Sequence, residues 1–233
     1  MKLYSILFED AKTAEQAIAE DIACIELSDG LTGNFNSILL VNRQQLLNAF
    51  EFSKQEEIKK AIFGYVAYSK SPRFGDLFTI NSSAALDKFG PLAYQIVMYS
   101  IHPAWLASDI GGLTTAAQTV WQKMFEYSFS DELYERKFLA SYSIDELIER
   151  LPRSLYKVFD SYIDLFQTRK SQRTEEAFLE WATENKITIR NFGNLWCYRK
   201  IMNDPKIGQM FRRGEDLLST LNSKYNIDKK DLK

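Results

Sequence analysis

Two strand-like segments followed directly by a helix start constrain the fold of this chain more than any other feature. "IFGYVAYS" (Ile62 to Ser69) and "LFTINSS" (Leu77 to Ser83) are rich in aromatic and β-branched residues. They flank "KSPRFGD", a turn signal that contains both Pro and Gly. This pattern predicts an antiparallel hairpin. "FGPLAYQIVMYSIH" (Phe89 to His102) follows and predicts a helix that begins near the end of the second strand.

The remaining segments predict an α/β core over residues 1–130 and an all-helical C-terminal extension over residues 131–233. In the core, "SILLVN" (Ser37 to Asn42) is an apolar run of strand length, and "RQQLLNAFEFSKQEEIKKA" is amphipathic and helical. In the extension, apolar residues recur at helical spacing, as at Val158, Phe159, Tyr162 and Phe166. The predicted helices are Asp131–Ala140, Ile144–Arg150, Arg153–Thr168, Thr174–Asn185, Asn194–Met202 and Lys206–Ser223.

Composition excludes several classes of function. The chain has 29 basic and 31 acidic residues, a net charge of -2, so its overall charge does not indicate nucleic-acid binding or a membrane surface. No apolar run approaches the roughly 18 residues that span a bilayer. The single histidine, His102, and two distant cysteines, Cys24 and Cys197, give no metal-binding spacing, and we predict no metal site. Both cysteines are expected to be reduced, small apolar residues of a cytosolic protein.

The helix start at Gly90 and Pro91 has two interpretations. A helix that begins here points free N–H groups and the positive end of its dipole toward the end of the preceding strand, which favours a bound pyrophosphate. Most helices with a Gly-Pro start bind nothing, however, and a well-capped core helix is the commoner outcome. If the site exists, we expect Phe89, Gly90, Leu92 and Ala93 to hold the anion, with the N–H groups of Leu92 and Ala93 as the main donors.

The order hairpin, turn, helix, short apolar segment and second helix ("LTTAAQTVWQKMFE") resembles the GNAT acetyltransferase superfamily. In that superfamily the turn reads Gln or Arg, two residues, Gly, one residue, Gly or Ala, and it wraps the pyrophosphate of coenzyme A. A later helix carries Asn, two residues, Ala, three residues, Tyr, and the tyrosine often protonates the leaving thiolate. The resemblance implies a GNAT-like mixed sheet and acetyl-CoA as cofactor.

The match to the GNAT motifs is partial. Gly90 fits the first glycine of the turn, whereas Asp87 stands at the Arg or Gln position and Leu92 at the second small residue. In the later helix Ala117 matches, but Thr114 replaces Asn and Trp121 replaces Tyr; "LFTINSS" carries no Glu to act as a general base. The resemblance therefore identifies no catalytic residue.

A second resemblance covers more of the chain. "FGPLAYQIVMYSI", "LASDIGGLTTAAQTVW" and "NLWCYRKI…FRRGEDLLS" are similar to an uncharacterised family of tailed-bacteriophage proteins with a GNAT-like core. Gly90, Pro91, Leu92 and Tyr94 match its helix start, and Ala117, Val120 and Trp121 match its later helix. Gln95 replaces an Asp, and Ile110 replaces the Arg of its Ser-Asp-Arg turn. This resemblance implies a phage protein in the host cytoplasm or in the virion.

Other conspicuous residues each have a structural and a functional interpretation. Ser108 and Asp109, before Gly111 and Gly112, are candidates to bind a substrate amine, although a turn-capping aspartate is commoner. Trp121, with Met124 and Phe125 at helical spacing, predicts core packing. The basic residues around the Tyr156–Phe166 aromatics allow base stacking, but the interspersed acidic residues favour a packing helix.

Two functions remain open from the sequence. The first is an acyl-coenzyme A-dependent N-acetyltransferase that modifies an amine of a protein or a nucleobase. The second is a non-catalytic phage protein, in the virion or in contact with the host, that uses a GNAT-like fold to bind a protein partner. The missing base, missing tyrosine and altered turn favour the second. The few dedicated side chains that acyl transfer requires favour the first.

Overall fold

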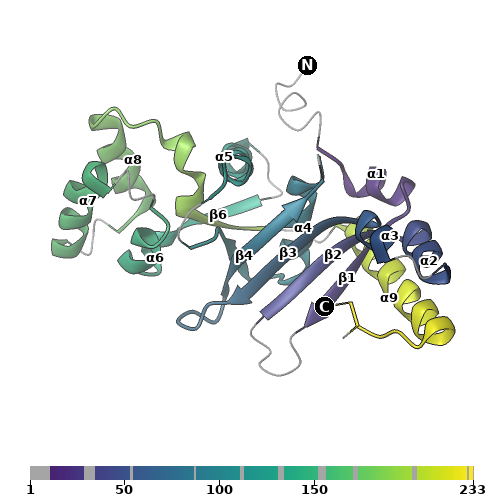
Figure 1. The fold of residues 1–233 in the computed structure, drawn as a ribbon. Coiled ribbons are helices and arrows are strands. Elements are labelled where there is room, and N and C mark those ends of the chain that lie inside the picture. The colour runs from purple at the N-terminus through teal and green to yellow at the C-terminus, as the bar shows by residue number, and fades with distance from the viewer. Residues whose placement is uncertain are drawn as a thin grey trace, which may run out of the picture. The chain divides into compact units, whose positions relative to one another are not determined.

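The computed structural model describes residues 11–28, 35–52, 55–86, 88–110, 113–130, 134–151, 156–169, 173–200, 204–229 and 231–232. Over these residues the strands follow the order β1-β2-β3-β4-β5-β7-β6 in one mixed seven-stranded sheet, and helices connect or follow them (Figure 1). The predicted α/β class is confirmed. No helix in the described ranges is long and apolar enough to cross a membrane.

The chain folds as two compact units, and each collects residues from distant parts of the sequence. Unit 1 comprises Met1–Ser69, Ser82–Ser100 and Met202–Lys233, and unit 2 comprises Lys70–Asn81 and Ile101–Ile201. The division does not fall at Ser130, where the sequence predicted the core to end. Residues 101–130, predicted as part of the core, belong to unit 2, and the last helix, predicted as part of the extension, belongs to unit 1.

Three antiparallel strands form the sheet of unit 1. β1 (Ile22–Ser28) pairs with β2 (Phe35–Asn42), and β2 pairs with β3 (Ile62–Lys70). Ile25 lies opposite Leu39 in the register of β1 and β2. Because side chains alternate between the faces of a strand, these two strands present a shared apolar face.

Polar side chains cap the N-termini of α1 and α2 in unit 1. Before α1 (Ala14–Ala19), the Thr13 hydroxyl accepts the Gln16 N–H, and the Gln16 side chain accepts the Thr13 N–H. Before α2 (Arg43–Glu51), the Asn42 side chain accepts the N–H of Gln45. These bonds satisfy N–H groups that a helix start leaves without partners. The short helix α3 (Gln55–Lys60) follows α2.

Helix α9 (Pro205–Tyr225) packs against the backbone of β1, the strand at one edge of the sheet. The side chain of Asp204 accepts the Lys206 N–H at 2.8 Å and starts this helix. Gly214 makes the close approach possible, because a Cβ there would lie 1.9 Å from the carbonyl oxygen of Cys24. A larger residue at this position would force the helix away from the strand.

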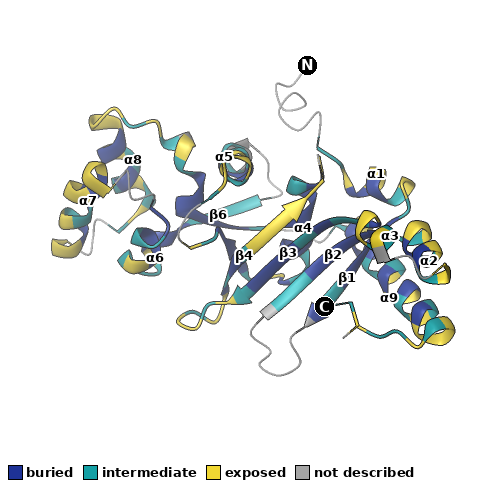
Figure 2. Cartoon of the chain, viewed as in Figure 1, coloured by how far each residue is buried: buried dark blue, intermediate teal, exposed yellow. Residues whose placement is uncertain are grey.

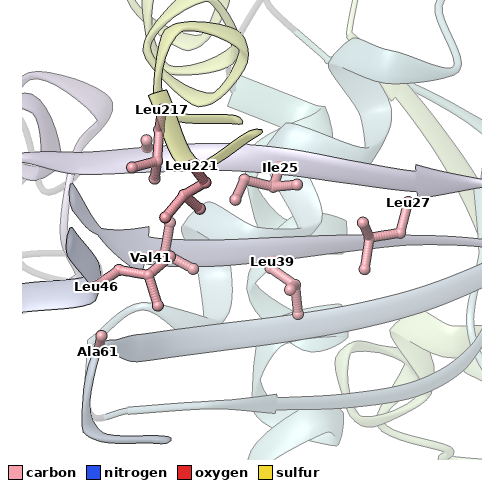
Figure 3. Close-up of a cluster of buried hydrophobic side chains, with 9 residues drawn as sticks. Ile25, Leu27, Leu39, Val41, Leu46, Ala61, Leu217 and Leu221 are labelled. Atoms are coloured by element: carbon pink, nitrogen blue, oxygen red, sulfur yellow. The ribbon is translucent and has the colours of Figure 1, made fainter. Parts of the chain in front are cut away.

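An aliphatic cluster forms the core on one face of the unit 1 sheet. Figure 3 shows Leu217 and Leu221 of α9 next to side chains of β1 and β2. The buried members are Ala23, Ile25, Leu27, Leu39, Val41, Leu46, Ala61, Leu217 and Leu221. Each large side chain removed from water contributes about 1.5–3 kcal/mol, so this cluster is a main source of the unit's stability.

The predicted hairpin is present. The N–H of Ser71, after β3, donates to the Leu77 carbonyl at the start of β4 (Leu77–Ala85), at 2.8 Å. At the other end, the N–H of Leu86 donates to the Phe63 carbonyl, also at 2.8 Å. The start of β3 therefore lies beside the end of β4, and the two strands are antiparallel.

The sheet of unit 2 contains a parallel pair. Residues Leu77–Thr79 of β4 lie parallel to β5 (Trp105–Ala107). β7 (Trp196–Lys200) pairs antiparallel with β5 on one side and with β6 (Tyr134–Phe138) on the other.

The strands β6 and β7 correct two helix predictions, Asp131–Ala140 and Asn194–Met202, so the chain after Ser130 is not all helical. Both strands are only five residues long. The apolar spacing of such a short segment does not distinguish a strand from a buried helix. Four predicted helices after Ser130 are present: α6 (Ile144–Ile148), α7 (Tyr156–Thr168), α8 (Glu175–Glu184) and α9.

Aromatic side chains fill the core of unit 2. Phe178 of α8 lies 4.8 Å, centroid to centroid, from Phe138 and 4.9 Å from Tyr162. Phe159, Tyr162 and Phe166 of α7 are completely buried. These rings are not accessible to nucleic-acid bases, and the prediction that α7 is a packing helix is confirmed.

Candidate ligand site at the start of helix α4

Helix α4 (Gly90–Ser100) begins after the exposed end of β4, as the sequence predicted. The residues Ser82 to Ala85 of this strand are exposed, and Figure 2 shows the strand end in yellow. Ser83 and Tyr94 join the strand end to the helix, because their hydroxyl oxygens lie 2.9 Å apart. An accessible strand end and a helix start thus lie together in unit 1.

Two N–H groups at the start of α4 already have partners. The Phe89 N–H donates to the Leu86 carbonyl at 3.1 Å, and the Ala93 N–H donates to the Phe89 carbonyl at 3.0 Å. The predicted anion contact through the Ala93 N–H is therefore not supported. Pro91 has no N–H group and Leu92 is only 1% exposed, so Gly90 is the residue with an N–H group at this helix start that is not buried.

The side chains of Phe89, Leu92 and Ala93 point into the core, since each is at most 3% exposed. These three residues hold the helix in place, and because this exposed fraction includes their backbone, a ligand cannot reach them directly. Gly90 differs, because a Cβ built on it would meet no atom within 4 Å. The backbone of Gly90 is thus open to approach.

The left-handed backbone position of this turn is Lys88, with φ 75°, and not Gly90. The φ of Gly90 lies outside the left-handed region, so residues other than glycine can adopt its backbone conformation. Asp87, which the sequence placed at the Arg or Gln position of the GNAT turn, lies outside the described residues.

A groove of about 570 Å³ lies between α2, α3 and the start of β3 in the same unit, and Phe63 connects it to the α4 start. Its floor includes Phe63, whose ring meets the Phe89 ring edge-to-face at 5.4 Å between centroids. Its sides come from α2 and α3 and include Phe52, which is 63% exposed. This volume lies in the range of small-molecule sites.

Basic side chains surround the groove and the helix start. Lys60 lines the groove and forms an ion pair with Glu57 at 2.7 Å, and this carboxylate raises the pKa of Lys60. Lys88 is exposed two residues before the helix, and its carbonyl accepts the Lys12 N–H at 2.9 Å. The Lys88 charge favours an anionic ligand at the helix start, whereas Glu57 offsets the Lys60 charge in the groove.

The predicted substrate residues Ser108 and Asp109 belong to unit 2, after β5. Ser108 is completely buried, and its carbonyl accepts a hydrogen bond from the Arg150 Nε at 3.2 Å. Asp109 is partly exposed, so it is the member of the pair that a substrate can reach. Burial raises the pKa of the Asp109 carboxyl, while the Ile110 N–H and the Arg150 charge lower it. Gly111 and Gly112 lie outside the described residues.

Arg150 organises a buried polar cluster around Ser108. Its guanidinium donates to the Glu146 carboxylate at 2.5 Å and to the Thr79 hydroxyl at 3.0 Å. Its backbone carbonyl accepts from the Asn194 side chain at 2.9 Å. Since these groups satisfy one another, the cluster is a structural element that fixes the segment after β5.

Helix α5 (Thr115–Ser130) does not supply the GNAT tyrosine. Thr114 caps the helix, because its hydroxyl accepts the Ala117 N–H at 3.2 Å. Trp121, Met124 and Phe125 are buried, which confirms their prediction as core residues. Among the described residues, no three His, Cys, Asp or Glu side chains gather where they could hold a metal ion.

Comparison of the chain with protein-family models, with curated proteins and with solved structures finds no match. The candidate site therefore depends on its own geometry. Sequence reasoning located the α4 start but missed the groove and Lys88. No short motif marks the groove, because its residues come from α2, α3 and β3 and carry no shared spacing.

Proposed function

We propose that this protein is an acyl-coenzyme A-dependent N-acyltransferase that takes acetyl-CoA as its donor. The observation that carries the proposal is the open backbone of Gly90 at the start of α4, beside the exposed end of β4. The N–H group of Gly90, with the helix dipole, would hold the pyrophosphate. The exposed Lys88 adds positive charge at the same place.

The exposed end of β4 suits the middle part of the donor. Its pantetheine arm is an extended chain with two amide groups, and such a chain can pair with a free strand backbone as an added strand does. The arm would run along Ser82 to Ala85, and its pyrophosphate would then meet the α4 start. The groove floored by Phe63 is large enough for a further part of the donor or for the acceptor amine.

The reaction would be direct acyl transfer. The acceptor nitrogen attacks the thioester carbonyl carbon, a C–N bond forms, and the C–S bond breaks. The nitrogen loses a proton, and the thiolate of coenzyme A gains one. The hydrogen-bonded hydroxyls of Ser83 and Tyr94 lie at the exposed strand end and are the groups that we propose as the proton donor to the thiolate.

Titration calorimetry with acetyl-CoA on the wild type and on Gly90→Asp tests the proposal. A carboxylate at position 90 enters open space and interacts favourably with the positive end of the helix dipole. The variant should therefore fold at least as stably as the wild type. Beside a pyrophosphate the same carboxylate repels by about 1 kcal/mol at 4 Å in water and by more when partly buried. We expect binding to weaken at least about fivefold.

Two matched variants control for size and for added charge. Gly90→Asn keeps the size of Asp without its charge and should bind more tightly than Gly90→Asp. Gly75→Asp adds a carboxylate at another open glycine, in the turn between β3 and β4, and should bind as the wild type does. Absence of acetyl-CoA binding to the wild type would contradict the proposal and favour the non-catalytic, partner-binding function.

A further inference from the structure

A cavity of about 180 Å³ lies inside unit 1, between the sheet and the helices α2 and α3. Its walls include Ile25 and Leu39 of the sheet, Phe50 of α2 and Ile58 of α3. Leu232, near the C-terminus, forms part of its boundary. The cavity therefore borders the aliphatic core whose buried members Figure 3 shows, and it is open on the side of Leu232 and the exposed Asp231.

The lining offers almost nothing to a water molecule. Among the described residues that line it, Asp231 is the charged one, and its carboxylate already accepts the Asp228 N–H at 2.9 Å. A buried water needs two to four polar partners, whereas an apolar cavity of about 150 Å³ stays dry and binds benzene or xenon. The cavity of this protein is slightly larger, and apart from the exposed Asp231 its described lining is similarly apolar.

We infer that this cavity is a binding site for a small uncharged apolar group, of the size of benzene or a short alkylbenzene. The Phe50 ring in the wall offers an aromatic contact, and the aliphatic side chains offer dispersion contacts that an empty cavity lacks. A charged or strongly polar ligand is excluded, because it would lose its water contacts without gaining hydrogen bonds. The site is independent of the proposed acyltransferase site.

Benzene is the first probe, and thermal unfolding in its presence is the measurement. A ligand that binds only the folded state raises Tm as its concentration rises. Leu39→Phe places a ring in the cavity wall and should reduce this shift at least severalfold. Leu27→Phe is the matched control, because Leu27 belongs to the same buried cluster but does not line the cavity. It should keep the benzene-dependent shift.

Xenon NMR on the wild type gives a second readout that does not depend on the folding of any variant. A concentration-dependent xenon shift, reversed by added benzene and lost in denaturant, is the expected result. No benzene-dependent rise in Tm together with no xenon shift beyond that of the denatured chain would overturn the inference. An equal rise in Tm in the wild type and in a folded Leu39→Phe variant would also overturn it.

Discussion

The aliphatic cluster of unit 1 and the core of unit 2 contain different side chains. The unit 1 cluster contains only Ala, Ile, Leu and Val, and it adjoins a cavity of about 180 Å³. The unit 2 core contains stacked and edge-to-face aromatic rings and a buried ion pair between Arg150 and Glu146. Apolar packing tolerates a void at a graded loss of stability, whereas a buried charge requires its partner. We therefore expect substitutions in the aliphatic cluster of unit 1 to lower the free energy of unfolding in small steps. Breaking the buried ion pair of unit 2 should lower it much more.

The chain carries natural reporters for this comparison. All four tryptophans, Trp105, Trp121, Trp181 and Trp196, belong to unit 2, so intrinsic fluorescence follows that unit. Each unit also holds one buried free cysteine, Cys24 in unit 1 and Cys197 in unit 2. Burial raises the pKa of Cys24, and it raises that of Cys197 to about 12. Both thiols should react only after their unit opens.

The largest expected effect comes from Arg150→Ala. This change leaves the Glu146 carboxylate buried without its charged partner and removes hydrogen bonds to Ser108 and Thr79. Breaking a buried pair in this way costs about 3–5 kcal/mol. Denaturant unfolding followed by tryptophan fluorescence measures the loss, and Cys197 should become reactive sooner than Cys24.

A paired replacement separates charge from packing. Arg150→Met combined with Glu146→Leu removes both charges and keeps apolar volume, so its loss should be much smaller than that of Arg150→Ala. If the double variant is as unstable as the single one, the buried pair is not the source of the sharp response. The expected difference between the two units in their loss of stability would then be contradicted.

The next effect is in unit 1, at Gly214→Ala. The added Cβ meets the carbonyl oxygen of Cys24 at 1.9 Å, so α9 must move away from β1. We expect a loss of about 1–3 kcal/mol, as for other overpacked sites. Gly90→Ala is the matched control within the same unit, because its Cβ enters open space and should not destabilise. The rate of Cys24 labelling measures both.

The hairpin and the helix that follows it could be predicted from the sequence because turn residues and strand composition agree there. "KSPRFGD" marks the turn, and the apolar run from Gly90 is long enough to identify α4. β6 and β7 could not be predicted in this way. Each is a short segment whose conformation depends on pairing with a distant part of the chain.

The candidate site shows a similar limit. Gly90 and Pro91 mark the helix start, but the sequence does not show that the Ala93 N–H is already bonded or that Gly90 faces open space. The sequence also does not show that Phe63 lines a groove, because its pattern indicates only a strand residue. Local patterns identify the element, and tertiary packing decides which of its groups a ligand can reach.

Equivalent helix caps provide a smaller test in both units. Thr13 caps α1 in unit 1, and Thr174 caps α8 in unit 2, each by accepting a backbone N–H at 3.2 Å. Replacing either by Ala should cost about 1 kcal/mol. Thr174→Ala should shift the tryptophan-detected transition, and Thr13→Ala should accelerate Cys24 labelling first. If each variant affects both reporters equally, the two units unfold together.

The smallest expected effect is a pH-dependent gain from Asp109→Asn in unit 2. Burial raises the pKa of this carboxyl above its ordinary value of 3.8, so the folded state holds the proton more tightly than the unfolded state. Stability therefore falls as the pH rises from the unfolded pKa through the folded pKa, and the penalty persists at neutral pH. Removing the charge should raise Tm at pH 7 and leave it nearly unchanged at about pH 3, where the wild-type carboxyl is largely protonated. Tryptophan-detected melts of both proteins at the two pH values measure this difference. A lower Tm for Asp109→Asn at pH 7 would mean that the attraction of Arg150 outweighs burial, and that Asp109 belongs to the buried ionic cluster rather than to a surface that a substrate amine can reach.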